Sequence, residues 1–436
     1  MMKKIQVGLI GFGTVGRGLA EVLLAQQKRI EKRSGLSIKL ARVADIAISE
    51  LPTQFAGVEL TNDVNELFSD PDIDIIVELI GGIEPAKSFM LKAIEAGKHV
   101  VTANKALISQ EGWDIFAAAA QKGVEVGFEA SVGGGIPVIK ALKEGLVANK
   151  ILSIMGIMNG TANYILTRMT DDGVPFAEAL KDAQEQGFAE ADPTYDIEGI
   201  DTAHKLAILI TMSYGMKISL DDITIEGISR LEPMDIQFAR EFGYRIKLLA
   251  ISRNHGDHVE ARVHPTMVLE NHLLASINGA YNAIHFTGDM VGNVLLYGQG
   301  AGMMPTGSAV AADIVDIARN IKNDSVNRVP ALSYLPEQIS TREITPMENL
   351  HCPYYFRIFA QDKPGVLSAV SGILSKYEIS IESVIQKGRK QSGPVSIVLR
   401  THNAQEAAVR KALTEIDALD VVTSETVKIR ILEDNE

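Results

Sequence analysis

Residues 5–16 of this chain read IQVGLIGFGTVG, and this segment indicates the fold of the first third of the protein. Its first six residues are mostly apolar and typical of a buried strand, and apolar residues recur with helical spacing from residue 14 onward. The first glycine after the strand permits a tight turn, the second lets the backbone approach a pyrophosphate, and the third lets helix and strand pack closely.

The free N–H groups at the start of that helix would bind phosphate oxygens. A purely structural glycine turn is the alternative, but the position between a strand and a helix favours a dinucleotide site. The expected cofactor-binding residues of this turn are Gly11, Phe12, Gly13, Thr14, Val15 and Gly16.

Strands and helices alternate through the first 150 residues. The alternation predicts right-handed β-α-β units and a parallel sheet, and therefore an α/β fold with an N-terminal Rossmann dinucleotide-binding domain. We expect this domain to span residues 1–135 and to be completed by a helix at 305–322. Further strands are expected at 37–44, 74–79, 98–102 and 124–129, and helices at 86–97 and 113–121.

The rest of the chain follows two other patterns. Mixed strands and helices predict an α+β domain over residues 136–304, and a polar, proline-containing stretch at 323–350 is expected to be a linker. Residues 351–432 have a βαββαβ order, which predicts a compact ferredoxin-like module able to fold alone. Its strands are expected at 354–360, 379–387, 394–401 and 421–431, and its helices at 366–377 and 404–416.

The composition excludes several classes of protein. A net charge of −13 over 436 residues opposes binding to nucleic acid, which needs a basic face. No run of about 18 uncharged apolar residues is present, so we expect no membrane span. Cys352 is the only cysteine, so an intrachain disulfide is impossible and a reducing compartment, the cytoplasm, is expected.

Residues 187–205 read GFAEADPTYDIEGIDTAHK and are the strongest candidate for a functional site. If a helix begins at Asp201, this acid and Lys205 lie one turn apart on the same face. An acid beside an ammonium suits a site that binds an amino acid and moves a proton. A solvated acidic loop with a helix cap is the alternative, but Gly187, Pro193 and Gly199 break the loop and hold its carboxylates in set directions.

Two further polar residues follow predicted strands, at the edge where open α/β sheets bind ligands. Asp45 would accept hydrogen bonds from a ribose hydroxyl, and a helix cap or solvated turn is an equal alternative. Lys105, in the segment TANK, would contact nicotinamide or a substrate oxyanion, and an ordinary surface lysine is the alternative. No arginine directly follows Asp45, although Arg42 and Lys39 are near, so the choice between NAD and NADP stays open.

Three loops complete the set of candidates. Residues 129–137, EASVGGGIP, are either a crossover between domains or a loop that presents backbone carbonyls to a cation. Residues 159–164, NGTANY, either lead into a helix or recognise a polar substrate. Residues 298–306, GQGAGMMPT, contain glycines that would let the backbone lie against the cofactor.

Taken together, these motifs resemble those of the bacterial homoserine dehydrogenases that carry a C-terminal ACT domain. GFGTVG, TANKALI, EASVGGGIP, NGTANYIL, the 187–205 segment and GQGAGMMPTGSAV occur in the family's order over nearly the whole chain. DKPGVL, at 362–367, resembles the first strand-to-helix turn of ACT domains. The resemblance implies reversible NAD(P)H-dependent reduction of L-aspartate 4-semialdehyde to L-homoserine, on the route to threonine, methionine and isoleucine.

The resemblance also implies roles for individual residues. Lys205 would donate a proton to the aldehyde oxygen as hydride arrives, and Lys105 would assist at substrate and cofactor. The substrate would be bound by Glu190, Asp201, Asp196, Asn159, Gly160, Thr161 and Tyr164. The cofactor would also contact Asp45, Lys105, Gly187 and Gly302. A monovalent cation, Na⁺ or K⁺, would be bound by the backbone carbonyls of Glu129, Val132, Gly134 and Ile136.

At the C-terminal end, the resemblance implies that an amino-acid effector, expected to be L-threonine, binds near Asp362 and Gly365. It also implies that residues 136–304 form the substrate-binding, catalytic and dimerisation domain, and that the protein assembles as a homodimer or homotetramer. Some relatives carry Arg or Lys where this chain has Ala44, so a strict preference for NADP is not implied.

Elementary electrostatics agrees with the lysine roles. Reduction of an aldehyde builds negative charge on oxygen, which a nearby ammonium can stabilise and protonate. Lys105 beside Lys205 would lower both pKa values by like-charge repulsion, while Asp201 would oppose that shift.

Two other hypotheses about the function are less consistent with these motifs. A sugar-alcohol or aspartate dehydrogenase of similar build usually relies on a different lysine or histidine constellation and has no reason for an ACT tail. An inert sensor that binds NAD and an effector would have little use for the pair formed by Lys105 and Lys205.

Overall fold

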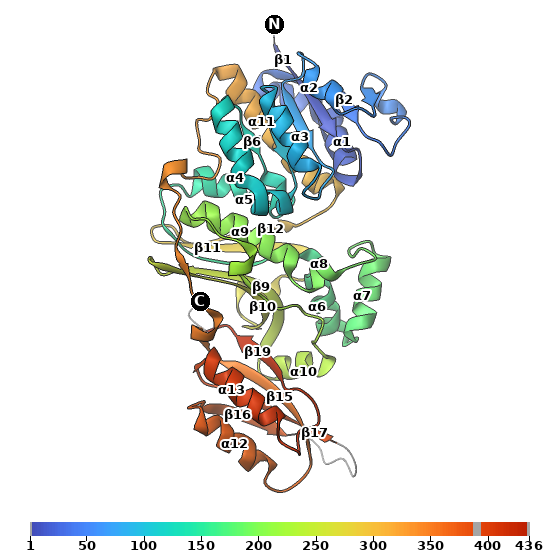
Figure 1. The fold of residues 1–436 in the computed structure, drawn as a ribbon. Coiled ribbons are helices and arrows are strands. Elements are labelled where there is room, and N and C mark those ends of the chain that lie inside the picture. The colour runs from blue at the N-terminus through green and yellow to red at the C-terminus, as the bar shows by residue number, and fades with distance from the viewer. Residues whose placement is uncertain (1, 387–393, 434–436) are drawn as a thin grey trace.

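The protein, as a computed structural model, is described over residues 2–386 and 394–433. An N-terminal part, a middle part and a C-terminal part follow one another along an elongated molecule (Figure 1). Lys387, the last residue of one expected strand, lies outside the described residues. Within the described ranges, no helix is both long enough and apolar enough to cross a membrane.

The N-terminal part is built on a parallel sheet, which confirms the predicted Rossmann-like fold. Its strand order is β3-β2-β1-β4-β5-β6, and the order reverses between β1 and β4. Such a reversal opens a crevice at the carboxyl ends of the strands, next to the glycine turn after β1. The strands are β1 (Lys3–Ile10), β2 (Leu36–Ala44), β3 (Glu59–Thr61), β4 (Ile75–Glu78), β5 (His99–Thr102) and β6 (Val126–Gly127).

Helices cover both faces of this sheet. Val77 points into the core formed with α1 and α11, whereas its neighbour Ile76 points into the core formed with α3 and α4. Helix α4 begins well before the expected residue 113, because the Asn104 side chain accepts a hydrogen bond from Leu107 N and caps it. The helices are α1 (Thr14–Ser34), α2 (Asn65–Ser69), α3 (Ala86–Glu95), α4 (Lys105–Lys122) and α11 (Met303–Asn323).

The middle part combines a mixed sheet with helices. The hairpin of β11 and β12 is absent from the sequence prediction, because the buried polar residues Asn282 and His285 interrupt the apolar run of β11. The strands are β7 (Ile151–Ile157), β8 (Thr224–Ile225), β9 (Tyr244–Asn254), β10 (His258–Leu269), β11 (Tyr281–Gly288) and β12 (Gly292–Gln299). The helices are α5 (Val138–Lys140), α6 (Gly160–Asp172), α7 (Phe176–Glu185), α8 (Thr194–Ile197), α9 (Ile200–Tyr214) and α10 (Pro233–Glu241).

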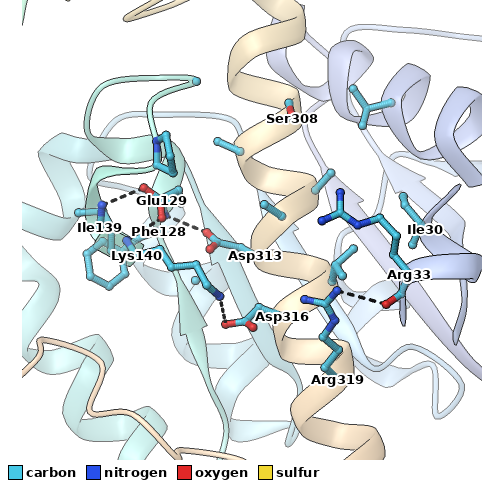
Figure 2. A pocket seen from close by; sticks show the side chains of 18 of the residues that line it. Ile30, Arg33, Phe128, Glu129, Ile139, Lys140, Ser308, Asp313, Asp316 and Arg319 are labelled. Atoms are coloured by element: carbon cyan, nitrogen blue, oxygen red, sulfur yellow. Dashed lines mark hydrogen bonds and ion pairs between the residues drawn. The ribbon is translucent and has the colours of Figure 1, made fainter. Parts of the chain in front are cut away.

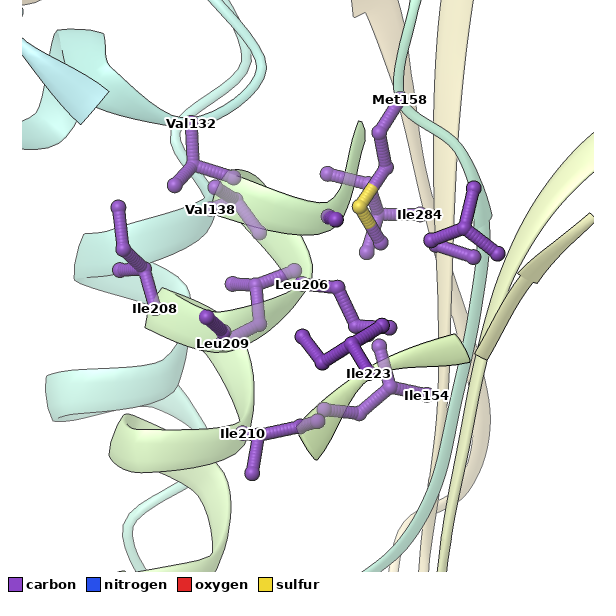
Figure 3. Packing of buried hydrophobic residues seen from close by; sticks show 14 of the residues in the cluster. Val132, Val138, Ile154, Met158, Leu206, Ile208, Leu209, Ile210, Ile223 and Ile284 are labelled. Atoms are coloured by element: carbon purple, nitrogen blue, oxygen red, sulfur yellow. The ribbon is translucent and has the colours of Figure 1, made fainter. Parts of the chain in front are cut away.

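Helix α9 lies in the core of the middle part and is buried from Asp201 to Tyr214. Leu206 and Leu209 lie among apolar side chains from the 129–140 segment, from β7 and from β11 (Figure 3). A helix that is packed on all sides belongs to the interior of a large domain. Polar groups in its first turns therefore stand on a rigid support.

Residues 323–350, the expected linker, run along the middle part. Strand β13 (Glu343–Ile344) pairs with β10, and Arg342 Nη2 donates to Tyr214 O at 2.8 Å. This stretch is therefore fixed to the sheet and to the end of α9.

The C-terminal part has the strand order β19-β15-β17-β16, which confirms the predicted ferredoxin-like fold. Its last strand begins at Val427 rather than at the expected residue 421. A short ladder joins β14 (His351–Cys352) to β18 (Ala404–Gln405). The main elements are β15 (Tyr354–Gln361), α12 (Val366–Lys376), β16 (Ile381–Gln386), β17 (Pro394–Thr401), α13 (Glu406–Asp417) and β19 (Val427–Ile431).

The C-terminal part is joined to the middle part by backbone pairing and buried charges. Strand β19 pairs with β10, so the two sheets are continuous. Arg430 donates to both carboxylate oxygens of Glu226 at 2.7 and 2.8 Å. Arg357 Nε donates to Asp235 Oδ1 at 2.7 Å, and both side chains are buried. The sequence pattern predicts a separate module and gives no sign of this junction.

Candidate active site

Two lysines from distant parts of the chain meet at one carboxylate. Lys205 Nζ lies 2.6 Å from Asp201 Oδ2, and Lys105 Nζ lies 2.9 Å from Asp201 Oδ1. Asp201 and Lys205 share a face of α9, as their spacing predicts, whereas Lys105 is the first residue of α4 and follows β5 closely. The structure therefore places both predicted catalytic lysines in one site at the carboxyl edge of the dinucleotide sheet.

The two ammonium groups differ in their surroundings. The Lys205 side chain is 9% exposed and also donates to Met158 O at 2.7 Å, whereas the Lys105 side chain is 39% exposed. Burial, with repulsion from Lys105, lowers the pKa of Lys205 despite the attraction of Asp201. Burial also opposes the charged form of Lys105, but attraction to Asp201 outweighs it and raises that pKa. Asp201 thus opposes the lowering of both lysine pKa values, as predicted, and its attraction prevails at Lys105 but not at Lys205.

The carboxylate between them is held ionised. Burial alone would raise the pKa of Asp201, but the two lysines outweigh burial and hold it well below its ordinary value. Asn159 Nδ2 donates to Asp201 Oδ2 at 2.8 Å and to Asp196 Oδ1 at 2.7 Å. Burial, with repulsion from Asp201, raises the pKa of Asp196. One asparagine thus fixes two of the three carboxylates that were predicted to bind substrate.

Two of the remaining residues predicted to bind substrate, Gly160 and Thr161, form the start of α6. Thr161 Oγ1 donates to Phe188 O at 2.6 Å, which ties the start of α6 to the acidic loop. Gly160 is needed where the chain passes close to Ala280, because a Cβ there would lie 2.8 Å from the carbonyl oxygen of that residue.

Two other predicted residues are not joined to the lysine pair. Tyr164 donates its hydroxyl to Asp182 Oδ2 of α7 at 2.7 Å, so this hydroxyl is engaged with α7 rather than with the pair. Glu190 is exposed, and within the described ranges its carboxylate has no hydrogen-bond partner. Its side chain therefore stays available to a ligand.

The glycine turn fits a bound pyrophosphate. Gly11 has a φ of +94°, and a Cβ on Gly16 would lie 2.1 Å from Gly11 O, so helix and strand meet here only through glycine. A Cβ on Gly13 would have no neighbour within 4 Å, which leaves open space above the helix N-terminus. Phe12 lies in the same turn, and Thr14 and Val15 are the first residues of α1.

Asp45 directly follows β2 and organises this turn. Its Oδ2 accepts a hydrogen bond from Phe12 N at 2.6 Å, and its Oδ1 accepts one from Ala47 N at 2.7 Å. The turn-stabilising role considered for this residue is therefore present, and a carboxylate oxygen can accept a second hydrogen bond from a ribose. Gly302, with a φ of +119°, precedes α11, and Gly187, with a φ of +75°, is exposed at the end of α7.

The Glu129 loop lies between β6 and α5, beside α11 (Figure 2). Glu129 accepts hydrogen bonds from Ile139 N and Lys140 N at 2.8 and 2.9 Å, and its own N–H donates to Asp313 at 2.8 Å. Burial, with repulsion from Glu129, raises the pKa of Asp313 to about 7. A hollow of about 470 Å³ lies here between α11 and the second half of α1, and the lysine pair is not part of it.

The four carbonyls predicted to bind a cation are only partly free. Glu129 O accepts a long hydrogen bond from Val132 N at 3.4 Å, and Ile136 O accepts one from Val138 N at 2.8 Å. Within the described part of the chain, the carbonyls of Val132 and Gly134 accept no hydrogen bond. Two oxygens of the loop are therefore available for a ligand without rearrangement.

Sequence reasoning missed three polar residues beside the lysine pair. His204 is fully buried, with Nδ1 2.6 Å from Ser109 Oγ and Nε2 2.7 Å from Tyr195 OH. A histidine directly before Lys205, at the start of the apolar run of α9, was the available signal, because a buried polar side chain needs partners. In the C-terminal part, Asp362 and Gly365 lie in the turn between β15 and α12, and Gly365 has a φ of +92°.

Three models of known protein families match successive segments of this chain. The model described as homoserine dehydrogenase matches residues 137–315, the one described as homoserine dehydrogenase, NAD binding domain, matches residues 11–129, and the ACT domain model matches residues 354–421. A homoserine dehydrogenase of Pseudomonas aeruginosa is 47% identical over 432 residues, which cover 99% of each chain.

Solved structures agree. The structure of a homoserine dehydrogenase from Thiobacillus denitrificans has a TM-score of 0.93 and 47% identity, with 99% of each chain covered. A hyperthermophilic archaeal homoserine dehydrogenase in complex with NADPH is 25% identical with a TM-score of 0.62, covering 72% of this chain and 98% of that one. The sugar-alcohol and aspartate dehydrogenases and the inert sensor are not supported by these matches. The chain belongs to the homoserine dehydrogenase family, as a member with a C-terminal ACT domain.

Proposed function

We propose that this NAD(P)-dependent homoserine dehydrogenase carries out its reaction at the first turns of α9, with Lys205 as proton donor and Lys105 assisting. The observation that carries this proposal is the meeting of both ammonium groups at Asp201, directly after the dinucleotide sheet. NAD(P)H, when bound, supplies the hydride that forms the new C–H bond at the aldehyde carbon of L-aspartate 4-semialdehyde.

Lys205 is suited to give a proton to the oxygen of that aldehyde. Two of its N–H bonds are used on Asp201 and Met158 O, so the third remains for the substrate. When the carbonyl electrons move onto oxygen, this N–H donates and the oxygen becomes the hydroxyl of homoserine. Because burial lowers the pKa of Lys205, its ammonium releases a proton more readily than an exposed lysine does.

Lys105 supplies a second positive charge. It has N–H bonds to spare beyond the one to Asp201, and its partial exposure leaves it within reach of both substrate and nicotinamide. Its raised pKa keeps it charged at neutral pH, so it stabilises the oxyanion without losing its own proton.

The substrate's amino group is assigned to Glu190 and its surroundings. The free carboxylate of Glu190 is suited to an ammonium ligand, and Asp196, held by Asn159, lies beside the lysine pair. Thr161 and Gly160 shape the start of α6 at this site, and Tyr164 ties α6 to α7 through Asp182.

A monovalent cation, Na⁺ or K⁺, would take the free carbonyls of Val132 and Gly134, with Glu129 O and Ile136 O completing the set. Hard cations prefer oxygen ligands, and the loop offers no softer donor. Equal activity in sodium, potassium and a bulky ammonium salt would contradict the proposed cation site.

Feedback control is assigned to the ACT domain, with L-threonine as the effector at the turn of Asp362 and Gly365. Left-handed Gly365 is the N-cap of α12, so the partial positive charge of the helix N-terminus lies at this turn. Assembly is supported by apolar residues exposed on the β11–β12 hairpin, where Tyr281 and Tyr297 are 39% and 54% exposed. We propose a homodimer or homotetramer in the cytoplasm, and sedimentation analysis decides between these states.

The test of the reaction is nicotinamide absorbance after homoserine is added with NAD and, separately, with NADP. Aspartate and a polyol are the control substrates. Of the three substrates, only homoserine is expected to give a rate. The ratio of the rates with NAD and with NADP then gives the cofactor preference, which Asp45 and Ala44 leave open. The absence of any rate with homoserine would overturn the proposal.

A further inference from the structure

His204 lies in α9 between Asp201 and Lys205 and has no part in the reaction proposed above. Its ring is fully buried, yet both nitrogens have partners from other elements. Nδ1 meets Ser109 Oγ of α4 at 2.6 Å, and Nε2 meets Tyr195 OH of α8 at 2.7 Å.

The hydrogens in this chain of contacts have one consistent arrangement. Ser109 Oγ donates to Ala106 O at 3.1 Å, so it accepts a hydrogen from His204 Nδ1–H. Nε2 is then unprotonated and accepts from the Tyr195 hydroxyl. Burial lowers the pKa of His204, in agreement with a neutral ring.

Each partner is attached to an element that carries a charged group of the site. Ser109 lies one turn beyond Lys105 in α4, and Tyr195 directly precedes Asp196 in α8. His204 directly precedes Lys205 in α9. The hydrogen bonds therefore join three separate segments whose charged groups must meet at one substrate.

We infer that His204 is a positioning residue that holds Lys105 and Asp196 in place relative to Lys205, through Ser109 and Tyr195. It exchanges no proton with substrate, because both of its nitrogens are already engaged. The inference rests on the roles proposed above for the two lysines. Its expected size follows from geometry, since a displacement of about 1 Å at a catalytic group can cost roughly a hundredfold in rate.

The experiment compares three substitutions at this position. His204→Leu removes both links, and kcat is expected to fall roughly 10- to 100-fold while nucleotide binding is nearly unchanged. His204→Asn keeps a donor toward Ser109, and His204→Gln keeps an acceptor toward Tyr195, so each should recover part of the loss. His264→Leu is the matched control, because His264 is also buried but lies in β10 away from the lysines. It should lower stability and leave kcat unchanged.

Double variants separate positioning from a general effect on packing. Ser109→Ala and Tyr195→Phe should each lower kcat less than His204→Leu does, and neither should add to the loss in that variant, because the link is already broken. Unchanged kcat in folded His204→Leu, or fully additive losses, would overturn the inference. If His204→Leu does not fold, the kcat of Tyr195→Phe tests the inference instead, because Tyr195 is 45% exposed and its replacement should not unfold the protein. An unchanged kcat in Tyr195→Phe would then overturn the inference.

Lys205→Ala, measured in parallel, keeps the two claims distinguishable. Turnover in Lys205→Ala would overturn the proposed lysine roles. Loss of turnover in Lys205→Ala beside full activity in His204→Leu would overturn the positioning role alone.

Discussion

Asp201 Oδ2 and Lys205 Nζ lie 2.6 Å apart, one helical turn from each other, and both side chains are nearly inaccessible to solvent. The other oxygen of Asp201 holds Lys105, so a single carboxylate keeps two ammonium groups together. Without that negative charge, the two lysines would repel each other in a poorly hydrated site.

Replacing Asp201 with asparagine should therefore damage both stability and catalysis. Asp201→Asn leaves the buried Lys205 ammonium without a counter-charge, which should cost about 3–5 kcal/mol in the free energy of unfolding. We also expect kcat to fall more than a hundredfold, because the lysines separate. Urea denaturation and steady-state kinetics measure the two effects.

Asp192→Asn is the control for this experiment, because Asp192 belongs to the same acidic loop but is exposed and bonded to Thr194. It should have wild-type stability and activity. Equal damage in both variants would mean that the acidic loop as a whole, rather than the lysine pair, explains the effect.

Glu190→Gln should act on substrate binding alone. The exposed carboxylate is assigned to the substrate ammonium, and loss of one charged hydrogen bond should raise KM for homoserine roughly 10- to 100-fold with little change in kcat. Glu185→Gln, in α7, is an exposed control. An unaltered KM in Glu190→Gln would leave this residue as an ordinary part of a solvated loop.

How much of this site could be predicted depends on the range of the contacts. The turn from Gly11 to Gly16 and the pair of Asp201 and Lys205 depend on local geometry, namely a strand-to-helix turn and one helical turn. The meeting of Lys105 with Asp201 followed from family resemblance, because the two residues lie nearly a hundred positions apart. The direction of the Lys105 pKa could not be predicted, since it depends on how closely Asp201 approaches each lysine.

The fold shows the same division. The parallel sheet and the βαββαβ module follow from repeating patterns along the chain. The pairing of β19 with β10 joins residues such as Thr266 and Arg430, and only the folded chain brings these strands together. Likewise, the partners of His204 come from α4 and α8, so the local sequence indicates that this buried histidine needs partners but does not identify them.

The junction between the middle and C-terminal parts should depend on its buried ion pair. Arg357→Met leaves the buried Asp235 carboxylate without its charged partner, and we expect a loss of about 3–5 kcal/mol in the free energy of unfolding. Arg230→Met breaks an exposed pair across the same junction, with Glu425, and should cost less than about 0.5 kcal/mol. Similar losses in the two variants, measured by urea denaturation, would contradict this account of the junction.

Lys247 should make the stability of the protein depend on pH. Its ammonium is buried among neutral acceptors, including Asn163 Oδ1 and Ile277 O, and burial lowers its pKa to about 7. Between this value and the ordinary lysine pKa, the unfolded chain binds the extra proton, so the folded state gains stability as pH rises.

Lys247→Met removes this dependence. Relative to the variant, the wild-type protein should become more stable by roughly 3–5 kcal/mol between pH 7 and about pH 10, as measured by urea denaturation at several pH values. A stability difference that stays constant over this range would show that Lys247 does not release its proton in the folded protein.

The lysine pair itself is tested most directly by the kcat of Lys205→Ala, measured with homoserine beside the nucleotide affinity of the same variant. Loss of turnover by more than about a thousandfold, with nucleotide affinity preserved, is the expected result, because the proton donor is gone while the glycine turn is intact. Turnover close to that of the wild-type enzyme would contradict the assignment of Lys205 as the group that protonates the substrate oxygen.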